Sequence, residues 1–226
     1  MSEHHHFAFV HGAGHGGWCW YKLANSLREN GHKATCIDLK GAGINLTDPN
    51  TVSSLDDYNQ PLYDFLSQLP LDQKVILVSH SVGGGSMTAA MCQYPSKVSM
   101  AVYVAAAMVK PGTIIPPILK EVLKICSGMI ETEAEKIWDF TFGNGPENLP
   151  TSIVDIPAAP EADKIPRVYV KTGKDNMFQS SRQDLMVTLW PPAQYFLLEE
   201  SDHSAFFSQP EALYKILTEA ASSISP

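Results

Sequence analysis

The chain has 226 residues, of which 44% are hydrophobic and 18% are charged. This length favours one domain that is large enough to bury a core without disulfide bonds or structural metal ions. A formal net charge of -8 argues against nucleic acid or an anionic membrane as the main partner, because both attract clusters of Lys and Arg. The four cysteines lack the paired spacing of a zinc site, and we interpret them as reduced core thiols.

The amino-terminal residues 1–6 are polar and lead directly into an apolar segment. They do not resemble a signal or transit peptide, and no apolar run along the chain is long enough to span a bilayer. The expected location is therefore cytoplasmic. Three consecutive histidines at positions 4–6 are weak evidence for metal binding, so no metal site is expected.

Strand-like and helix-like segments alternate along most of the chain. Short apolar runs are separated by longer segments with apolar residues at helical spacing. This alternation predicts an α/β fold with a mostly parallel sheet and helices on both faces, with functional residues at the carboxyl ends of the strands. The expected strands are 7–10, 33–39, 75–78, 99–104, 167–172 and 195–198, and the expected helices are 18–30, 54–69, 86–94, 179–190 and 210–223.

Glycines are concentrated in residues 11–17, directly after the first expected strand. Three of them fit the G-x-G-x-x-G pattern of dinucleotide-binding loops, and Asp38 ends the next strand, so this loop alone leaves a bound dinucleotide open. The alternative is an oxyanion hole, whose backbone donors lie in such a loop in hydrolases. The serine turn described next favours this alternative, with the N–H groups of Ala13 and Val82 as the expected donors and no cofactor.

The apolar run 75–78 is followed by the sequence Ser-His-Ser-Val-Gly and then by a helical segment. A serine between small residues on a sharp strand-to-helix turn is typical of a nucleophile elbow, whose usual pattern is G-x-S-x-G. Ser79 stands in place of the first glycine and is small enough to keep the same packing. Ser81 is therefore the expected nucleophile.

Regular alternation stops in residues 109–165, where Pro-rich stretches flank two helix-like segments, 119–125 and 132–140. We interpret this part as a cap insertion within a single domain of residues 1–226. An ordinary loop-rich excursion is the alternative, although long unstructured connections are uncommon in compact domains.

Three residues with the chemistry of a hydrolase triad each follow a different expected strand: Ser81, Asp175 and His203. Their order along the chain, Ser then Asp then His, is that of the α/β-hydrolase fold. A serine hydroxyl needs a nearby base, and that base needs an orienting carboxylate. His203 would accept the proton of Ser81, and Asp175 would orient His203. Asp202 is not expected to do so, because side chains of adjacent residues diverge.

Several residues border the expected site and are candidates for contact with the substrate. For the histidines among them, packing or hydrogen bonds to loops are slightly favoured over substrate contact. The aromatic residues would form either pocket wall or core. The candidates are Gly12, His15, His80, Trp138, Phe178 and Ser204.

Several motifs together resemble the plant methylesterase and hydroxynitrile lyase family of α/β-hydrolases. They lie in residues 11–23, 38–39, 58–62, 74–84 and 201–203, and residues 143–152 and 190–192 resemble the branch that hydrolyses methyl indole-3-acetate. The resemblance implies a cofactor-free serine carboxylesterase that cleaves methyl esters of small carboxylic acids through an acyl-enzyme. Such acids include plant hormones, as in methyl indole-3-acetate, methyl salicylate and methyl jasmonate, and alkaloid intermediates.

Two positions separate the activities of this family. The lyases carry a threonine where Gly12 stands and a lysine where Ser204 stands, so an esterase is favoured over a hydroxynitrile lyase. Decarboxylation after ester cleavage is a further possibility, as is a non-catalytic protein that binds a small acid. Family members have a longer cap than this chain, in which the segment after Ser152 is short. The site would therefore be more open, or it would be completed by a partner subunit in a homodimer.

Overall fold

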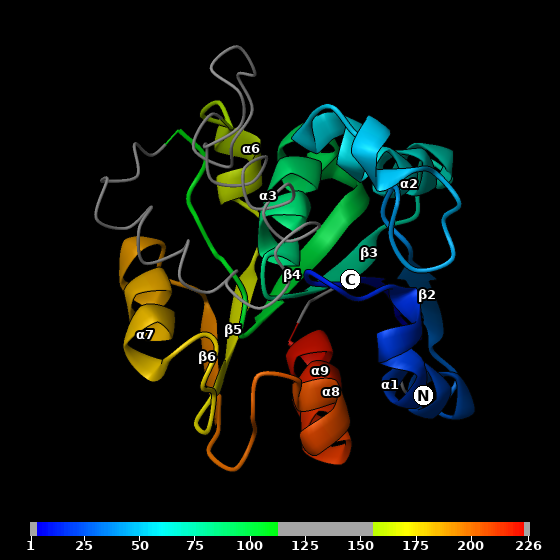
Figure 1. Cartoon of the computed structure of the whole chain (residues 1–226). Coiled ribbons are helices and arrows are strands. Elements are labelled where there is room, and N and C mark those ends of the chain that lie inside the picture. The colour runs from blue at the N-terminus through cyan, green and yellow to red at the C-terminus, as the bar shows by residue number, and fades with distance from the viewer. Residues whose placement is uncertain (1–3, 113–155, 224–226) are drawn as a thin grey trace.

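The computed structural model describes residues 4–112 and 156–223. Within these residues, six strands form one parallel sheet in the order β2-β1-β3-β4-β5-β6 (Figure 1). The predicted α/β class is confirmed. The strands are β1 (His6–Val10), β2 (Lys33–Ile37), β3 (Val75–His80), β4 (Val98–Val104), β5 (Arg167–Thr172) and β6 (Gln194–Leu198).

Helices cover both faces of the sheet. Figure 1 shows α2, α3 and α6 on one side of the strands and α1, α8 and α9 on the other. The α-helices are α1 (Tyr21–Glu29), α2 (Leu55–Gln68), α3 (Gly83–Gln93), α6 (Pro160–Asp163), α7 (Ser180–Leu189), α8 (Ala205–Ser208) and α9 (Pro210–Ser222). The 3₁₀ helices are η1 (Gly17–Trp20), η2 (Pro49–Thr51) and η3 (Pro95–Lys97).

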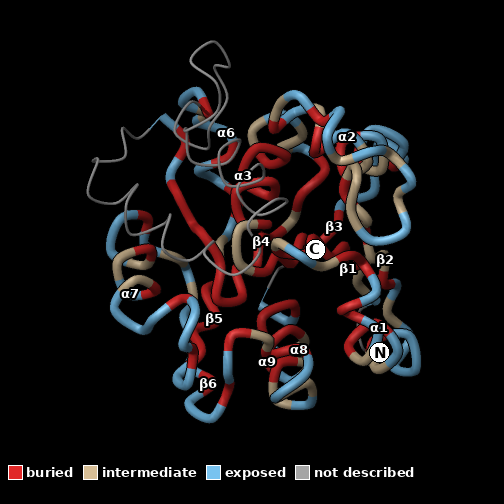
Figure 2. The backbone as a smooth tube through the Cα atoms, in the orientation of Figure 1, coloured by how far each residue is buried: buried red, intermediate tan, exposed pale blue. Residues whose placement is uncertain are grey.

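Alternate residues of β1, β3 and β4 belong to two separate hydrophobic cores. In β1, Phe7 and Phe9 pack with Trp20 on the α1 side, whereas Ala8 and Val10 face α2 and α3. Figure 2 shows the central strands buried between helices whose outer surfaces are exposed. Burial of a large apolar side chain stabilises the fold by about 1.5–3 kcal/mol. The two cores therefore hold the strand ends, where the predicted site lies, in fixed positions.

Most element boundaries agree with the predictions within one or two residues. Ser54 begins α2 as expected, because its Oγ accepts the backbone N–H of Asp57 at 3.0 Å. Helix α3 begins at Gly83, three residues before the predicted start at Ser86. Glycine in this first turn allows close packing, since a Cβ at Gly84 would overlap with the backbone oxygen of Ala107 after β4.

The segment predicted to form a cap, residues 109–165, is described only at its two ends. Both helix-like segments predicted within it, 119–125 and 132–140, lie outside the described residues. The ends are adjacent, because Gly112 donates its N–H to the oxygen of Ile156 at 2.7 Å. Ile156 and Ala162 are buried in the core on the α3 side. The last residues of the segment are therefore part of the domain core, and a cap in the remainder stays a prediction.

Candidate active site

Ser81 lies on the sharp turn between β3 and α3 and has a φ of 54°. This left-handed conformation is unfavourable for a residue with a side chain and costs about 1–3 kcal/mol. Hydrogen bonds on both sides hold it: the oxygen of Ser81 accepts the N–H of Ala107, just after β4, at 2.9 Å and that of Gly84 in α3 at 3.1 Å. The turn is therefore a strained strand-to-helix elbow, as the serine motif predicted.

The glycine-rich loop after β1 contacts this elbow. A Cβ at Gly12 would lie 2.8 Å from Ser81 Cβ, and a Cβ at Gly83 would overlap with the backbone oxygen of His11. Glycine at both positions therefore allows the loop to lie directly beside Ser81. This contact lies between β1 and β3, where the strand order reverses and where ligand sites form in open parallel sheets.

Three side chains from three strand ends form a continuous chain of hydrogen bonds. Asp175 Oδ2 lies 2.7 Å from His203 Nδ1, and His203 Nε2 lies 3.0 Å from Ser81 Oγ. Because a carboxylate only accepts hydrogen bonds, Nδ1 carries the proton and Nε2 is left to accept the serine hydroxyl. The Asp175 side chain is fully buried and that of His203 is 10% exposed. Asp202 accepts the N–H of Ser204 at 2.9 Å instead.

Asp175 is held by further groups that sequence reasoning missed. Its Oδ2 also accepts the hydroxyl of Thr172 at 2.9 Å, and the amide of Gln183 lies 3.4 Å away. The one sequence signal was that Thr172 ends a strand three residues before Asp175. Nothing in the local pattern marks Gln183, because its contacts depend on the packing of α7 against β5.

His11 fixes the first residues of the glycine-rich loop. Its Nε2 accepts the N–H of Leu39 at 3.2 Å, so its Nδ1 carries the proton and donates to the oxygen of Gly12 at 2.8 Å. Burial lowers the pKa of His11 to about 4, despite the opposing effects of the Gly12 bond and of Asp38. His11 is therefore neutral near pH 7 and ties the loop to the end of β2.

The two expected oxyanion donors are the N–H groups of Ala13, in the glycine-rich loop, and of Val82. The oxygen of the Gly12–Ala13 peptide is bound by His11, and in a trans peptide the N–H of Ala13 points the opposite way. Val82 is the N-cap of α3, so its N–H has no acceptor within the helix. Val82 is the residue after Ser81, and Ala13 belongs to the loop that contacts Ser81. Their role as oxyanion donors stays a prediction.

His15 and His80 bond the backbone of loops around the site. His80 Nε2 lies 2.9 Å from the oxygen of His203, and His15 Nδ1 lies 2.8 Å from the oxygen of Ala13. His80 is 1% exposed. Burial, followed by the neighbouring His203, holds the pKa of His80 well below its usual value. These bonds correspond to the loop hydrogen bonds that were slightly favoured over substrate contact.

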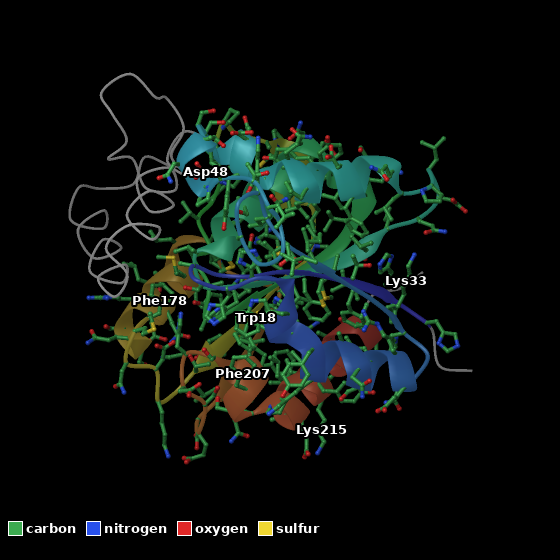
Figure 3. The ribbon with its side chains drawn as sticks, turned by 45° about the vertical axis from the view of Figure 1, so that its right-hand side comes forward. Trp18, Lys33, Asp48, Phe178, Phe207 and Lys215 are labelled. Carbon is green, nitrogen blue, oxygen red and sulfur yellow. The ribbon has the colours of Figure 1, made fainter. Side chains whose placement is uncertain are left out.

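The other pocket candidates occupy different environments. Phe178 is 5% exposed and belongs to the core on the α3 side, and Ser204 is half-buried beside His203. Trp138 lies outside the described residues. Two residues that were not predicted as pocket candidates, Trp18 and Phe207, stack with ring centroids 6.3 Å apart (Figure 3). Trp18 is 54% exposed and also stacks on His15, so it forms an exposed apolar surface near the site.

Comparison with known proteins agrees with this geometry. The model of the alpha/beta hydrolase family matches residues 7–216. Methylesterase 18 of Arabidopsis thaliana is 69% identical over 264 aligned positions, which include all of both chains. The pFDCC methylesterase MES16 of the same plant is 45% identical over 255 positions, covering 96% of this chain and 94% of that protein. The chain belongs to the plant methylesterase family of α/β-hydrolases.

Solved structures of the family superpose on most of the chain. The crystal structure of Arabidopsis MES16 matches with a TM-score of 0.78 and covers 96% of this chain and 99% of that one. Tomato methylketone synthase I in complex with 2-tridecanone matches with a TM-score of 0.82 at 26% identity, over 99% and 100% of the two chains. As a member of the methylesterase family, the protein is a carboxylic ester hydrolase.

The chain is shorter than the methylesterase it was aligned with. The alignment with Methylesterase 18 has 264 positions and this chain has 226 residues, so at least 38 positions of the relative have no counterpart here. A shortened chain was expected from the resemblance to the family, and the location of the missing positions in the cap stays a prediction.

Two further findings concern metals and membranes. Residues 4–112 and 156–223 bring together no group of three or more His, Cys, Asp or Glu side chains that could hold a metal ion. None of the helices described there is both long and apolar enough to cross a membrane.

Proposed function

We propose that the protein is a serine esterase that hydrolyses methyl esters of small carboxylic acids through an acyl-enzyme. The observation that carries this proposal is the unbroken chain of hydrogen bonds from Asp175 through His203 to Ser81. Each of the three groups has the chemistry that its position requires. Asp175 is a buried carboxylate, His203 has an unprotonated Nε2, and Ser81 carries its hydroxyl on a strained turn.

In the first half of the reaction, Ser81 Oγ attacks the ester carbonyl carbon while His203 Nε2 accepts the hydroxyl proton. The resulting oxyanion accepts hydrogen bonds from the N–H groups of Ala13 and Val82. One such donor typically stabilises a transition state by about 3 kcal/mol. The tetrahedral intermediate then collapses, the bond to the methoxy oxygen breaks, and His203 returns the proton so that methanol leaves.

In the second half, water attacks the acyl-enzyme and gives its proton to His203. The Ser81 ester bond breaks, the carboxylic acid leaves, and the proton returns to Ser81 Oγ. Asp175 stays ionised throughout, orients the imidazole and stabilises the imidazolium that forms in both halves. The protein's own groups carry every proton in this scheme, so it needs no cofactor.

Two lines of reasoning support a methyl ester as substrate. The protein belongs to a family whose named members include methylesterases, and a relative at 45% identity is a pFDCC methylesterase. The resemblance also argues against a hydroxynitrile lyase, because Gly12 and Ser204 lack the hydroxyl and ammonium groups that lyases carry there. The shorter chain favours a more open site that admits a substrate bulkier than the hormone esters.

The experiment is a turnover assay over a panel of methyl esters: methyl indole-3-acetate, methyl salicylate, methyl jasmonate and pFDCC. Wild type is compared with Ser81→Ala and with Ser67→Ala, a control at an exposed serine on α2. We expect Ser81→Ala to lower turnover at least about 10³-fold and Ser67→Ala to leave it unchanged.

The panel also tests the competing functions. If wild type and Ser81→Ala are equally inert and both bind the free acids tightly, the protein is a binding protein and not an esterase. With a cyanohydrin and a β-keto acid added to the panel, cyanohydrin cleavage would instead support a lyase, and carbon dioxide release from the β-keto acid would support a decarboxylase. Two further expectations, a cytoplasmic location and a homodimer, are tested by imaging a fluorescent fusion in plant cells and by sedimentation of the purified protein.

A further inference from the structure

The carboxylate of Asp175 is surrounded by donors from the protein. Its Oδ1 accepts the backbone N–H groups of Met177 at 2.9 Å and Phe178 at 2.7 Å. Its Oδ2 accepts His203 Nδ1–H at 2.7 Å and the hydroxyl of Thr172 at 2.9 Å. Because the side chain is fully buried, these groups take the place of water around its charge. The Thr172 hydroxyl and His203 Nδ1–H therefore bind the same carboxylate oxygen, Oδ2.

The amide of Gln183 lies beside this hydroxyl and holds the Thr172 backbone. Gln183 Nε2 donates to the oxygen of Phe178 at 2.7 Å, and Gln183 Oε1 accepts the N–H of Thr172 at 3.0 Å. These bonds identify the nitrogen end of the amide, since the reverse orientation would place oxygen against oxygen. The second hydrogen of Nε2 is shared between Thr172 Oγ1 at 3.1 Å and Thr172 O at 3.2 Å.

Thr172 has a single hydroxyl proton, and two acceptors compete for it. Asp175 Oδ2 is nearer, at 2.9 Å against 3.4 Å for Gln183 Oε1, and it carries charge. The proton therefore points at Asp175. Thr172 and Gln183 are both 0% exposed, so water cannot replace either bond. Without the hydroxyl, Oδ2 would keep His203 Nδ1–H and the longer contact with Gln183 Nε2, and two backbone N–H groups would still hold Oδ1. Oδ2 would then lose its nearer buried partner besides His203 and would be held less tightly opposite the imidazole.

We propose that Thr172 and Gln183 are positioning residues that keep Asp175 Oδ2 aligned with His203. This inference rests on the proposed function, in which Asp175 orients the imidazole that activates Ser81. Both residues act through the carboxylate and not on the ester itself. Their loss therefore lowers kcat and leaves KM nearly unchanged, because contacts with the substrate remain.

The first test compares Thr172→Val, which keeps the shape and removes the hydroxyl, with Thr172→Ser, which keeps the hydroxyl. Gln183→Met removes the amide at similar length. Thr188→Val is the matched control, because Thr188 is an exposed threonine on α7. With p-nitrophenyl acetate as probe, we expect Thr172→Val and Gln183→Met to lower kcat about tenfold with KM within about twofold. Thr172→Ser and Thr188→Val should stay within about twofold of wild type in both.

The second test observes the hydrogen bond itself. A proton shared between imidazole and carboxylate gives a far-downfield proton NMR signal, which here belongs to His203 Nδ1–H. We expect this signal to move upfield or broaden in Thr172→Val and Gln183→Met and to persist in Thr172→Ser and Thr188→Val. Observation of this signal requires no turnover of an ester. A wild type that cleaves no ester would therefore overturn the proposed function, while the signal would still decide the positioning role.

Two outcomes would overturn the inference. One is a folded Thr172→Val protein with wild-type kcat and an unchanged signal. The other is an equal loss in Thr172→Val and Thr172→Ser, which would assign the effect to packing and not to the hydroxyl. If Thr172→Val does not give a cooperative unfolding transition, Gln183→Met decides by the same two readouts.

Discussion

His80 Nε2 donates a hydrogen bond of 2.9 Å to the backbone oxygen of His203. The residue before the proposed nucleophile thus holds the loop that carries the proposed base. The two rings also lie close together, with centroids 4.5 Å apart. A carbonyl accepts only from a protonated nitrogen, so His80 carries its proton on Nε2. The low pKa of His80, caused first by burial and then by His203, keeps this ring neutral.

Replacing His80 should therefore impair catalysis through the position of His203. We expect His80→Phe, which keeps an aromatic ring and loses the donor, to lower kcat about tenfold. His80→Gln retains an N–H donor and should recover part of the loss. Steady-state kinetics on the best ester of the panel check this. Wild-type kcat in a folded His80→Phe protein would contradict the role of the hydrogen bond.

The buried histidines make stability depend on pH. Burial lowers the pKa of His11 to about 4 from the usual 6.5, so the folded state disfavours the proton that the unfolded chain accepts. Stability is then complete above pH 6.5 and is lost as the pH falls from 6.5 toward 4. For His11 alone, the loss at pH 5 is about 2 kcal/mol.

Urea unfolding of wild type and His11→Gln at pH 7.5 and pH 5 measures this contribution. The difference in unfolding free energy between the two pH values should be about 2 kcal/mol smaller in His11→Gln, with His4→Gln as the control at an exposed histidine. If the difference is the same in all three proteins, the pKa of His11 does not change on folding, and the prediction is wrong.

Gly83 should tolerate no side chain. A Cβ there would overlap with the backbone oxygen of His11, and neither backbone segment can move freely, because α3 packs against β1 and β3. We expect Gly83→Ala to lower the unfolding free energy by about 2–3 kcal/mol and to reduce kcat by displacing the glycine-rich loop. Thermal unfolding and kinetics of one preparation check both effects. Wild-type values in both would show that the contact can relax.

Lys97 should contribute to stability without affecting catalysis. It is 8% exposed, and its Nζ donates to the oxygens of Leu69 at 2.8 Å and Pro70 at 2.7 Å, where α2 ends. Lys97→Met leaves these carbonyls unpaired, so we expect a loss of about 2 kcal/mol in unfolding free energy and an unchanged kcat. Lys215→Met, at an exposed lysine of α9, should change neither. Equal unfolding midpoints for both variants would refute this role for Lys97.

The main features of the fold and site could be predicted because they depend on local patterns. Ser81, Asp175 and His203 each follow an apolar strand, and the carboxyl ends of parallel strands share one edge of the sheet. Ser54 was recognisable as the start of α2 from its type and from the acidic residues after it.

The features that could not be predicted depend on contacts between distant residues. Gln183 and Thr172 lie 11 residues apart and meet only when α7 packs on β5. His80 bonds a backbone oxygen 123 residues away, and any residue type supplies such an oxygen. Helix α8 has four residues, which is too short for a helical period to be seen.

Strands β4 and β5 pair directly, with Val104 opposite Val170, although β4 ends at Val104 and β5 begins at Arg167. Gly112 and Ile156 are likewise joined by a hydrogen bond across the intervening residues. The two ends of the intervening segment thus lie together at Gly112 and Ile156, and the chain then runs back to the amino end of β5. The strands that carry Ser81, Asp175 and His203 are held by the sheet and not by this connection, so a change in the length of the connection would leave the three reacting groups in place.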